Sequence, residues 1–251
     1  MGILVEAHGV RKSYRHGDLS TEVLRRVDMS VSAGEMVSIV GPSGSGKSTL
    51  LYCLAGLEVP DAGEIHLMGV DIVRARRGES AKVRARHVGF VFQQYNLMPS
   101  LSVGENVSLP ERFAGRRVSR KDMCDLFERV GMGGKEHARP ADLSGGEAQR
   151  VALARAVVSG PDIVFADEPT GALDTANGNV VLDMLRAMAD GESQSVVMVT
   201  HDLEAAARAD RVLVMRDGKI VHMMTRSTSR EILAAMEKME PRDAAEGAML
   251  R

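Results

Sequence analysis

The sequence predicts an α/β fold in which helices flank a parallel sheet. Apolar runs rich in β-branched residues, "MVSIV" at 36–40, "HVGFVFQ" at 87–93, "DIVFAD" at 162–167 and "SVVMVTH" at 195–201, have the composition of buried strands. The segments between these runs have helical periodicity, which indicates helical connections and therefore parallel pairing.

Antiparallel strands are expected beside this core. The segment "EVLRRVDMSVSAGE" at 22–35 alternates apolar and polar residues and then turns at Gly34. In "RVLVMRDGKIVHM" at 211–223, Asp217 and Gly218 separate two strand-like runs, which is a strong hairpin signal. The predicted fold is thus an α/β core with an antiparallel β subdomain.

Residues 93–160 are expected to form a helical subdomain. Ser119 is a helix cap with Asp122 at the third position, and the helix should end at Gly131. Its apolar face comprises Met123, Leu126, Phe127 and Val130. We assign residues 1–222 to one domain and residues 223–251 to a short amphipathic helix (Ile232, Leu233, Met236, Met239) followed by a frayed tail from Pro241.

Composition excludes several classes of protein. The 251 residues are 44% hydrophobic and 26% charged, with a net charge of -2, so no basic footprint for nucleic acid is present. The apolar runs are too short for a membrane span, and no signal peptide is apparent, which predicts a cytosolic chain. Cys53 and Cys124 lack metal-type spacing, and we expect both to be core thiols.

The stretch "GPSGSGKST" at 41–49 matches the phosphate-binding loop pattern, and it lies between an apolar strand and an apolar helix, as that pattern requires. Its glycines would let backbone N–H groups surround phosphate oxygens. Lys47 would reach the β- and γ-phosphates, and the Ser48 hydroxyl would bind Mg²⁺. The alternative is a Gly/Ser-rich surface loop. The predicted nucleotide-binding residues here are Gly41, Pro42, Ser43, Gly44, Ser45, Gly46, Lys47, Ser48 and Thr49.

Polar residues end three of the predicted core strands. Asp167 and Glu168 follow an apolar strand, where Asp167 suits Mg²⁺ coordination through water and Glu168 suits polarisation of an attacking water. His201 would donate to the γ-phosphate, and Gln93 would sense Mg²⁺ or the attacking water. Each of these residues has an alternative interpretation. The two acids could be a loop start or a helix cap, and His201 could be a solvated or core histidine. Gln93 could be an ordinary polar strand end, and Gln94 is a second candidate for its role.

The stretch "LSGGEAQR" at 143–150 begins a predicted helix with adjacent glycines. Ser144 and Glu147 form a capping box, but Gly145 and Gly146 are unfavourable in a helix by about 1 kcal/mol each. Glycine at a helix start allows close approach to bare N–H groups, which favour anions. The pattern therefore predicts a phosphate contact at this helix N-terminus.

In this order, the motifs resemble those of the ATP-binding cassettes of ABC transporters, from Tyr14 to about His222. Residues 41–49 resemble Walker A, Gln93 the Q-loop, "LSGGE" the signature, "IVFADE" Walker B, Asp174 in "GALD" the D-loop and His201 in "VTHD" the H-loop. The resemblance implies a P-loop NTPase (RecA-like) core that binds ATP with Mg²⁺ and hydrolyses it.

The resemblance further implies a head-to-tail homodimer in which Ser144, Gly145, Gly146 and Glu147 of one copy contact ATP held by the other. It also places Tyr14 against adenine, with a packing role as the alternative; stacking of this kind is worth about 1–3 kcal/mol. No nucleic-acid partner is implied, because the chain lacks the heptad arms or second cassette of soluble DNA-acting or ribosome-acting relatives.

The stretches "GFVFQQYNLMPSLSVGENVSLP" and "RPADLSGGEAQRVALARAVV" resemble the subgroup that acts in lipoprotein release, macrolide export and cell-division signalling. That subgroup implies separate membrane-spanning partners and a peripheral location on the cytoplasmic face of the cell membrane. A regulatory ATPase that signals without cargo is the alternative. We interpret the basic run at 74–87 as a solvated face, with lipid or partner contact as the alternative.

Overall fold

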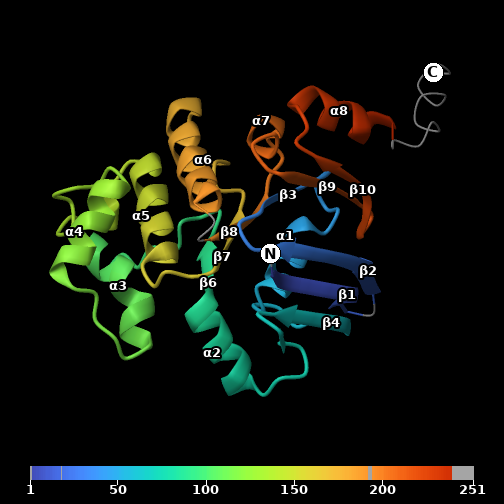
Figure 1. Ribbon diagram of the computed structural model, residues 1–251, viewed down its shortest axis with the longest axis horizontal. Helices are drawn as coiled ribbons and strands as arrows, with labels where there is room; N and C mark the ends of the chain where they lie inside the picture. Colours follow the sequence, from blue (N-terminus) through green and yellow to red (C-terminus); the bar gives the residue numbers. More distant parts are fainter. Residues whose placement is uncertain (1, 18, 192–193, 239–251) are drawn as a thin grey trace.

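The computed structural model describes residues 2–17, 19–191 and 194–238. Within them, a six-stranded sheet has the order β10-β9-β3-β8-β7-β6 (Figure 1). All neighbouring strands from β9 to β6 pair in parallel, and β10 pairs with β9 in antiparallel fashion. The strands are β3 (Met36–Val40), β6 (Val88–Val91), β7 (Ile163–Asp167), β8 (Ser195–Val199), β9 (Arg211–Arg216) and β10 (Lys219–Thr225). This confirms the predicted α/β class.

Alternate residues of the central strands supply two cores. Val37 and Ile39 of β3 face one cluster together with helix α1 (Lys47–Leu54). Met36 and Val40 face a second cluster on the opposite side of the sheet. The second side is covered by α6 (Thr175–Asp190), α7 (Leu203–Ala206) and α8 (Ser229–Lys238) (Figure 1). Every residue of β3, β7 and β8 is buried, which explains why these strands read as continuous apolar runs.

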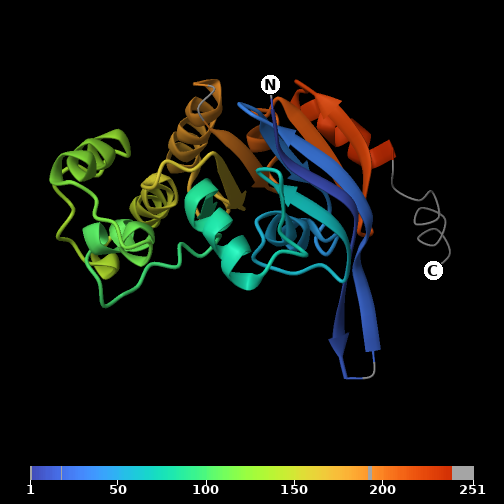
Figure 2. The same cartoon turned by 60° about the horizontal axis from the view of Figure 1, so that its bottom comes forward.

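A second sheet, of order β2-β1-β4-β5, covers α1 from the other side. Its strands are β1 (Ile3–His16), β2 (Leu19–Ser32), β4 (Ala62–Leu67) and β5 (Val70–Asp71). The hairpin of β1 and β2 extends beyond the rest of the protein (Figure 2). The predicted turn at Asp217 and Gly218 is confirmed, because both residues have positive φ, 47° and 77°.

The chain between β6 and β7 is helical, as the periodicity predicts. It comprises α3 (Val103–Phe113), α4 (Arg120–Arg129), the short 3₁₀ helix η1 (Pro140–Asp142) and α5 (Gly145–Val157), and α3, α4 and α5 share an apolar cluster. Ser119 caps α4 as predicted, with its hydroxyl accepting from the Asp122 N–H at 3.1 Å. In α8, Ile232 is fully buried; Met239 and the tail lie outside the described residues.

One expectation needs correction. Cys53 is buried, but Cys124 on α4 is exposed, because α4 presents only Leu126 and Phe127 as buried residues. The basic run is largely a solvated face, as expected: Arg74 is exposed and pairs with Glu64 at 2.6 Å at the surface, whereas His87 is partly buried and lies 2.6 Å from Asp162. Helix α2 (Arg77–His87) carries most of this run.

Among the described residues, no helix combines the length and apolar character needed to cross a membrane.

Candidate functional site

The loop at residues 41–46 joins β3 to α1 and is pressed against two neighbouring strands. Gly41 has φ 153°, and a Cβ there would collide with the carbonyl oxygen of Met215. Gly46 has φ 97°, and a Cβ there would lie 2.7 Å from the carbonyl oxygen of Val23. These glycines therefore permit close packing of the loop as well as access to its N–H groups.

Lys47 is anchored by the loop that precedes it. Its Nζ donates to the carbonyl oxygens of Gly41 at 2.9 Å and Pro42 at 3.0 Å. Burial lowers the pKa of Lys47, and the carboxylates of Glu168 and Asp167 partly offset that effect. The ammonium group thus lies within the electrostatic reach of both strand-end acids.

Asp167 at the end of β7 is 3% exposed and accepts hydrogen bonds from two side chains of α1. Its Oδ1 accepts from the Ser48 hydroxyl at 2.9 Å, and its Oδ2 accepts from the Tyr52 hydroxyl at 2.7 Å. Burial, followed by the hydrogen bond to Asp167, raises the pKa of Tyr52 to about 12. Motif analysis missed Tyr52, although its position four residues after Ser48 places both on one helix face.

Glu168 and His201 form a second hydrogen-bonded pair at the same edge of the sheet. Glu168 Oε2 lies 2.8 Å from His201 Nδ1 and accepts from the His201 backbone N–H at 3.3 Å. The Glu168 side chain is largely buried, whereas that of His201 is 70% exposed. Glu168 has φ 47°, an unusual backbone conformation for a non-glycine residue, and its own N–H donates to the Val199 carbonyl oxygen at 2.9 Å.

Gln93 follows β6, which pairs in register with β7. A Cβ built on Gly171 would lie 3.8 Å from Gln93 Nε2 and 3.5 Å from Glu168 Cβ, so both side chains flank this glycine. The structure therefore brings Lys47, Ser48, Asp167, Glu168, His201 and Gln93 to the carboxyl edge of the parallel strands, where α/β proteins bind ligands.

The predicted capping box at the start of α5 is present. The Glu147 N–H donates to the Ser144 hydroxyl at 3.3 Å, and the Ser144 N–H donates to Glu147 Oε2 at 2.9 Å. The other carboxylate oxygen of Glu147 pairs with Lys135. The Lys135 ammonium, followed by the Ser144 hydrogen bonds, lowers the pKa of Glu147 to about 2.

The two glycines of α5 have different surroundings. Gly145 is exposed, and its Cβ would meet only the Tyr95 hydroxyl within 3.4 Å. Gly146 is buried, and its Cβ would lie 2.6 Å from Cγ and Oδ1 of Asn177 on α6. Packing within the chain thus accounts for Gly146, whereas it does not account for Gly145.

Asp174 and Tyr14 occupy surface positions. Asp174 caps α6 by accepting from the Asn177 N–H at 2.9 Å, and this hydrogen bond lowers the pKa of Asp174. Tyr14, on β1, is 42% exposed, and the Lys12 ammonium lies 5.4 Å from its ring centroid. An exposed ring on the projecting hairpin is available for a contact beyond the chain.

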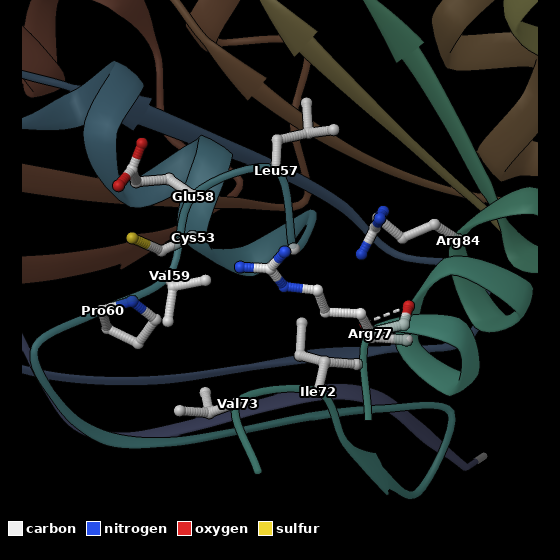
Figure 3. A pocket seen from close by; sticks show the side chains of 11 residues that line it. Cys53, Leu57, Glu58, Val59, Pro60, Ile72, Val73, Arg77 and Arg84 are labelled. Atoms are coloured by element: carbon white, nitrogen blue, oxygen red, sulfur yellow. Dashed lines mark hydrogen bonds between the residues drawn. The ribbon is translucent and has the colours of Figure 1, made fainter. Parts of the chain in front are cut away.

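A separate pocket of about 270 Å³ lies beyond the C-terminal end of α1 (Figure 3). Arg77 and Arg84 of α2 line it together with Cys53, Leu57 and Ile72. None of the predicted site residues lines this pocket, so it is distinct from the edge that carries the chemistry.

Comparison with known proteins identifies the class that this edge defines. The family model described as ABC transporter matches residues 24–171. The lipoprotein-releasing system ATP-binding protein LolD of Shewanella sp. (strain MR-4) is 44% identical over 86% of this chain and 94% of the relative. The chain belongs to the ABC transporter family, as the ATP-binding, ATP-hydrolysing cassette.

Two further comparisons agree with this assignment. The macrolide export ATP-binding/permease protein MacB of Escherichia coli is 44% identical over 87% of this chain, which spans only 34% of that relative's length. The dimeric structure of a post-hydrolysis state of the ATP-binding cassette MJ0796, bound to ADP and Pi, has a TM-score of 0.83. It is 35% identical, and the match covers 89% of this chain and 99% of the other.

Proposed function

We propose that this ATPase powers a separate membrane-spanning transporter subunit, and that ATP is hydrolysed at the edge formed by the ends of β3, β6, β7 and β8. The observation that carries the proposal is the convergence of two hydrogen-bonded pairs there, Ser48 with Asp167 and Glu168 with His201. A P-loop lysine, a strand-end acid and a second acid held by an imidazole are the groups that phosphoryl transfer to water needs.

In this proposal the N–H groups of residues 41–49 bind the phosphates, and Lys47 contacts the β- and γ-phosphates. The residues fit Mg²⁺, because the Ser48 hydroxyl and the Asp167 carboxylate are hard oxygen ligands 2.9 Å apart. Gln93, after the neighbouring strand β6, would supply a further amide oxygen. Bound Mg²⁺ would neutralise charge that develops on the phosphate oxygens. The exposed ring of Tyr14 would stack on adenine.

Glu168 is the proposed general base. Its carboxylate would accept a proton from the attacking water while the new P–O bond forms and the bond to ADP breaks. His201 Nδ1 holds Glu168 Oε2 at 2.8 Å. Its second ring nitrogen would donate to the γ-phosphate oxygens when both ring nitrogens carry hydrogen. Because the His201 ring is exposed, a phosphate can reach it without rearrangement of the core.

The dimeric cassette structure supports a homodimeric arrangement. We propose a head-to-tail pair in which Ser144, Gly145, Gly146 and Glu147 of one copy, together with Asp174, complete the nucleotide site of the other. The nearest atoms around Gly145 and Gly146 belong to Tyr95, Ala172, Leu173 and Asn177, all outside the P-loop. None of these neighbours belongs to residues 41–49 of the same chain, which supports a contact with nucleotide held by another copy.

We further propose that residues 1–222 form the cassette, with residues 93–160 as its helical subdomain and residues 223–251 as an appended segment. The cassette would dock its membrane-spanning partner through residues 94–101, which follow Gln93 and include the half-exposed Met98. This docking would place it on the cytoplasmic face of the cell membrane. The names of the relatives concern export and lipoprotein release, which favours transport over the alternative of cargo-free signalling.

The proposal is tested with Glu168→Gln, which neutralises only the base. Hydrolysis should slow by about 10²–10⁴-fold while ATP binding persists, and the variant should accumulate as an ATP-bound dimer in size-exclusion chromatography. Glu204→Gln, on the exposed start of α7, is the matched control and should hydrolyse ATP normally. Wild-type turnover in Glu168→Gln, in a preparation free of other ATPases, would remove Glu168 from the reaction.

A further inference from the structure

Helix α1 provides both hydrogen-bond donors to the carboxylate of Asp167. Ser48 donates to Oδ1 at 2.9 Å, and Tyr52, one helical turn later, donates to Oδ2 at 2.7 Å. Asp167 is 3% exposed, so its orientation is decided by these protein contacts more than by solvent. The two donors differ in kind, since Ser48 belongs to the phosphate-binding loop and Tyr52 does not.

An aromatic cluster holds the Tyr52 ring. The ring centroid of Tyr52 lies 5.6 Å from that of Phe90 on β6, and Phe90 lies 4.4 Å from Phe92 and 6.5 Å from Phe165 on β7. The whole chain has only five phenylalanines and three tyrosines, so this cluster concentrates a scarce residue type between α1, β6 and β7. Packing of this kind fixes the ring and therefore the direction of its hydroxyl.

We infer that Tyr52 is a positioning residue for the metal-binding carboxylate of Asp167, holding Oδ2 so that Oδ1 alone is presented to Ser48 and the P-loop. This inference rests on the proposed role of Asp167 at the Mg²⁺ site.

Mg-ATP binding would involve the two donors to Asp167 in different ways. If the Ser48 hydroxyl is used as a metal ligand, a lone pair faces the metal while its O–H can still donate to Asp167 Oδ1. Oδ1 then lies on the metal side of the carboxylate, and the Tyr52 hydroxyl on Oδ2 is a second, independent contact that opposes rotation of the carboxylate. Loss of such an outer partner typically weakens metal affinity about 10- to 100-fold.

The same contact connects Asp167 to the strand that precedes Gln93. Phe90 of β6 packs on Tyr52, and Gln93 lies three residues later in the turn that follows this strand. Tyr52 thus connects the elements that position Ser48, Asp167 and Gln93, namely α1, β7 and β6. A shift of one of these elements would therefore change the position of the Asp167 carboxylate.

Tyr52→Phe tests the inference, since it removes the hydroxyl and keeps the ring. We expect the Mg²⁺ concentration at half-maximal hydrolysis to rise about 10-fold, within the range for outer-shell partners. The affinity for a fluorescent ATP analogue should stay unchanged in EDTA and fall when limiting Mg²⁺ is present. Phe90→Leu is the matched control: it disturbs the same cluster, keeps the hydroxyl, and should raise the Mg²⁺ requirement much less.

An unchanged Mg²⁺ requirement in Tyr52→Phe overturns the inference. So does an equal rise in Phe90→Leu, or an equal loss of nucleotide affinity in EDTA, because either result assigns the effect to packing. Asp167→Asn is measured alongside. If Asp167→Asn leaves the Mg²⁺ requirement unchanged, the proposed metal site itself fails; if only Asp167→Asn alters it, the site stands and the role of Tyr52 is wrong.

Discussion

Alanine substitutions at Gly145 and Gly146 separate the two reasons for glycine at the start of α5. At Gly146, an added Cβ would lie 2.6 Å from Cγ and Oδ1 of Asn177. Asn177 cannot easily move away, because it donates to Asp174 at 2.7 Å and accepts from Arg150 at 3.1 Å. At Gly145, the atom nearest to an added Cβ is the Tyr95 hydroxyl at 3.1 Å, the far end of a long side chain, and the next neighbour is 3.8 Å away.

These contacts set the expected energies. Overpacking at Gly146 costs about 1–3 kcal/mol, and replacing a helical glycine returns up to about 1 kcal/mol, so Gly146→Ala should lose about 1–2 kcal/mol. For a domain of this size, that loss lowers Tm by about 2–8 °C. Gly145→Ala meets no comparable obstacle and should leave Tm unchanged or slightly raised.

The assay pairs thermal unfolding with steady-state hydrolysis of ATP. Gly145→Ala should hydrolyse ATP about 10- to 100-fold more slowly at full stability, because a methyl group there holds the phosphate away from the helix N–H groups. Wild-type hydrolysis by Gly145→Ala would refute the phosphate contact. Equal stability of the two variants would refute the packing argument for Gly146.

Three further outcomes are expected from other parts of the molecule. Glu147→Gln keeps the capping box but loses the Lys135 pair, so urea unfolding should show a loss of about 1 kcal/mol at neutral pH. Because the folded pKa of Glu147 is depressed to about 2, this difference is present above the ordinary pKa, should shrink as pH falls below about 5, and should be lost as pH falls through about 2. Tyr14→Ala should weaken ATP and GTP binding alike by about 10-fold, and Tyr14→Phe should be nearly silent, since stacking uses the ring face; unchanged affinity means that Tyr14 only packs. Met98→Glu, at a half-exposed site after Gln93, should abolish co-purification with the membrane partner while hydrolysis persists, and intact co-purification would relocate the interface.

The fold is predictable because three central strands are fully buried and several helices are capped locally. The continuous apolar, β-branched runs at β3, β7 and β8 are typical of a parallel sheet covered on both faces. Ser119 and Ser144 form their caps with residues three positions later, so sequence spacing alone identifies the helix starts.

The partners of the site residues were not predictable in the same way. The sequence pattern shows Tyr52 only as one residue of an apolar helix. Its hydroxyl reaches Asp167 because α1 packs beside the end of β7 in the folded protein. Asn177 likewise constrains Gly146 across more than thirty positions of chain. Composition does not determine which face of a short helix packs against the core. The exposure of Cys124 on α4 and the position of Arg84 of α2 at a pocket therefore could not be predicted.

The composite nucleotide site is tested most directly in a tandem-linked dimer carrying Lys47→Ala and Ser144→Arg. Head-to-tail pairing joins Lys47 of one copy to Ser144 of the other, so lesions placed on different copies fall in one site and leave the second intact. Lesions placed together on one copy damage both sites. ATP-dependent closure of the linked dimer, measured by fluorescence transfer between labelled copies, should therefore persist in the split arrangement and be lost in the combined one. Greater closure in the combined arrangement would contradict the sandwich and place the whole site within a single chain.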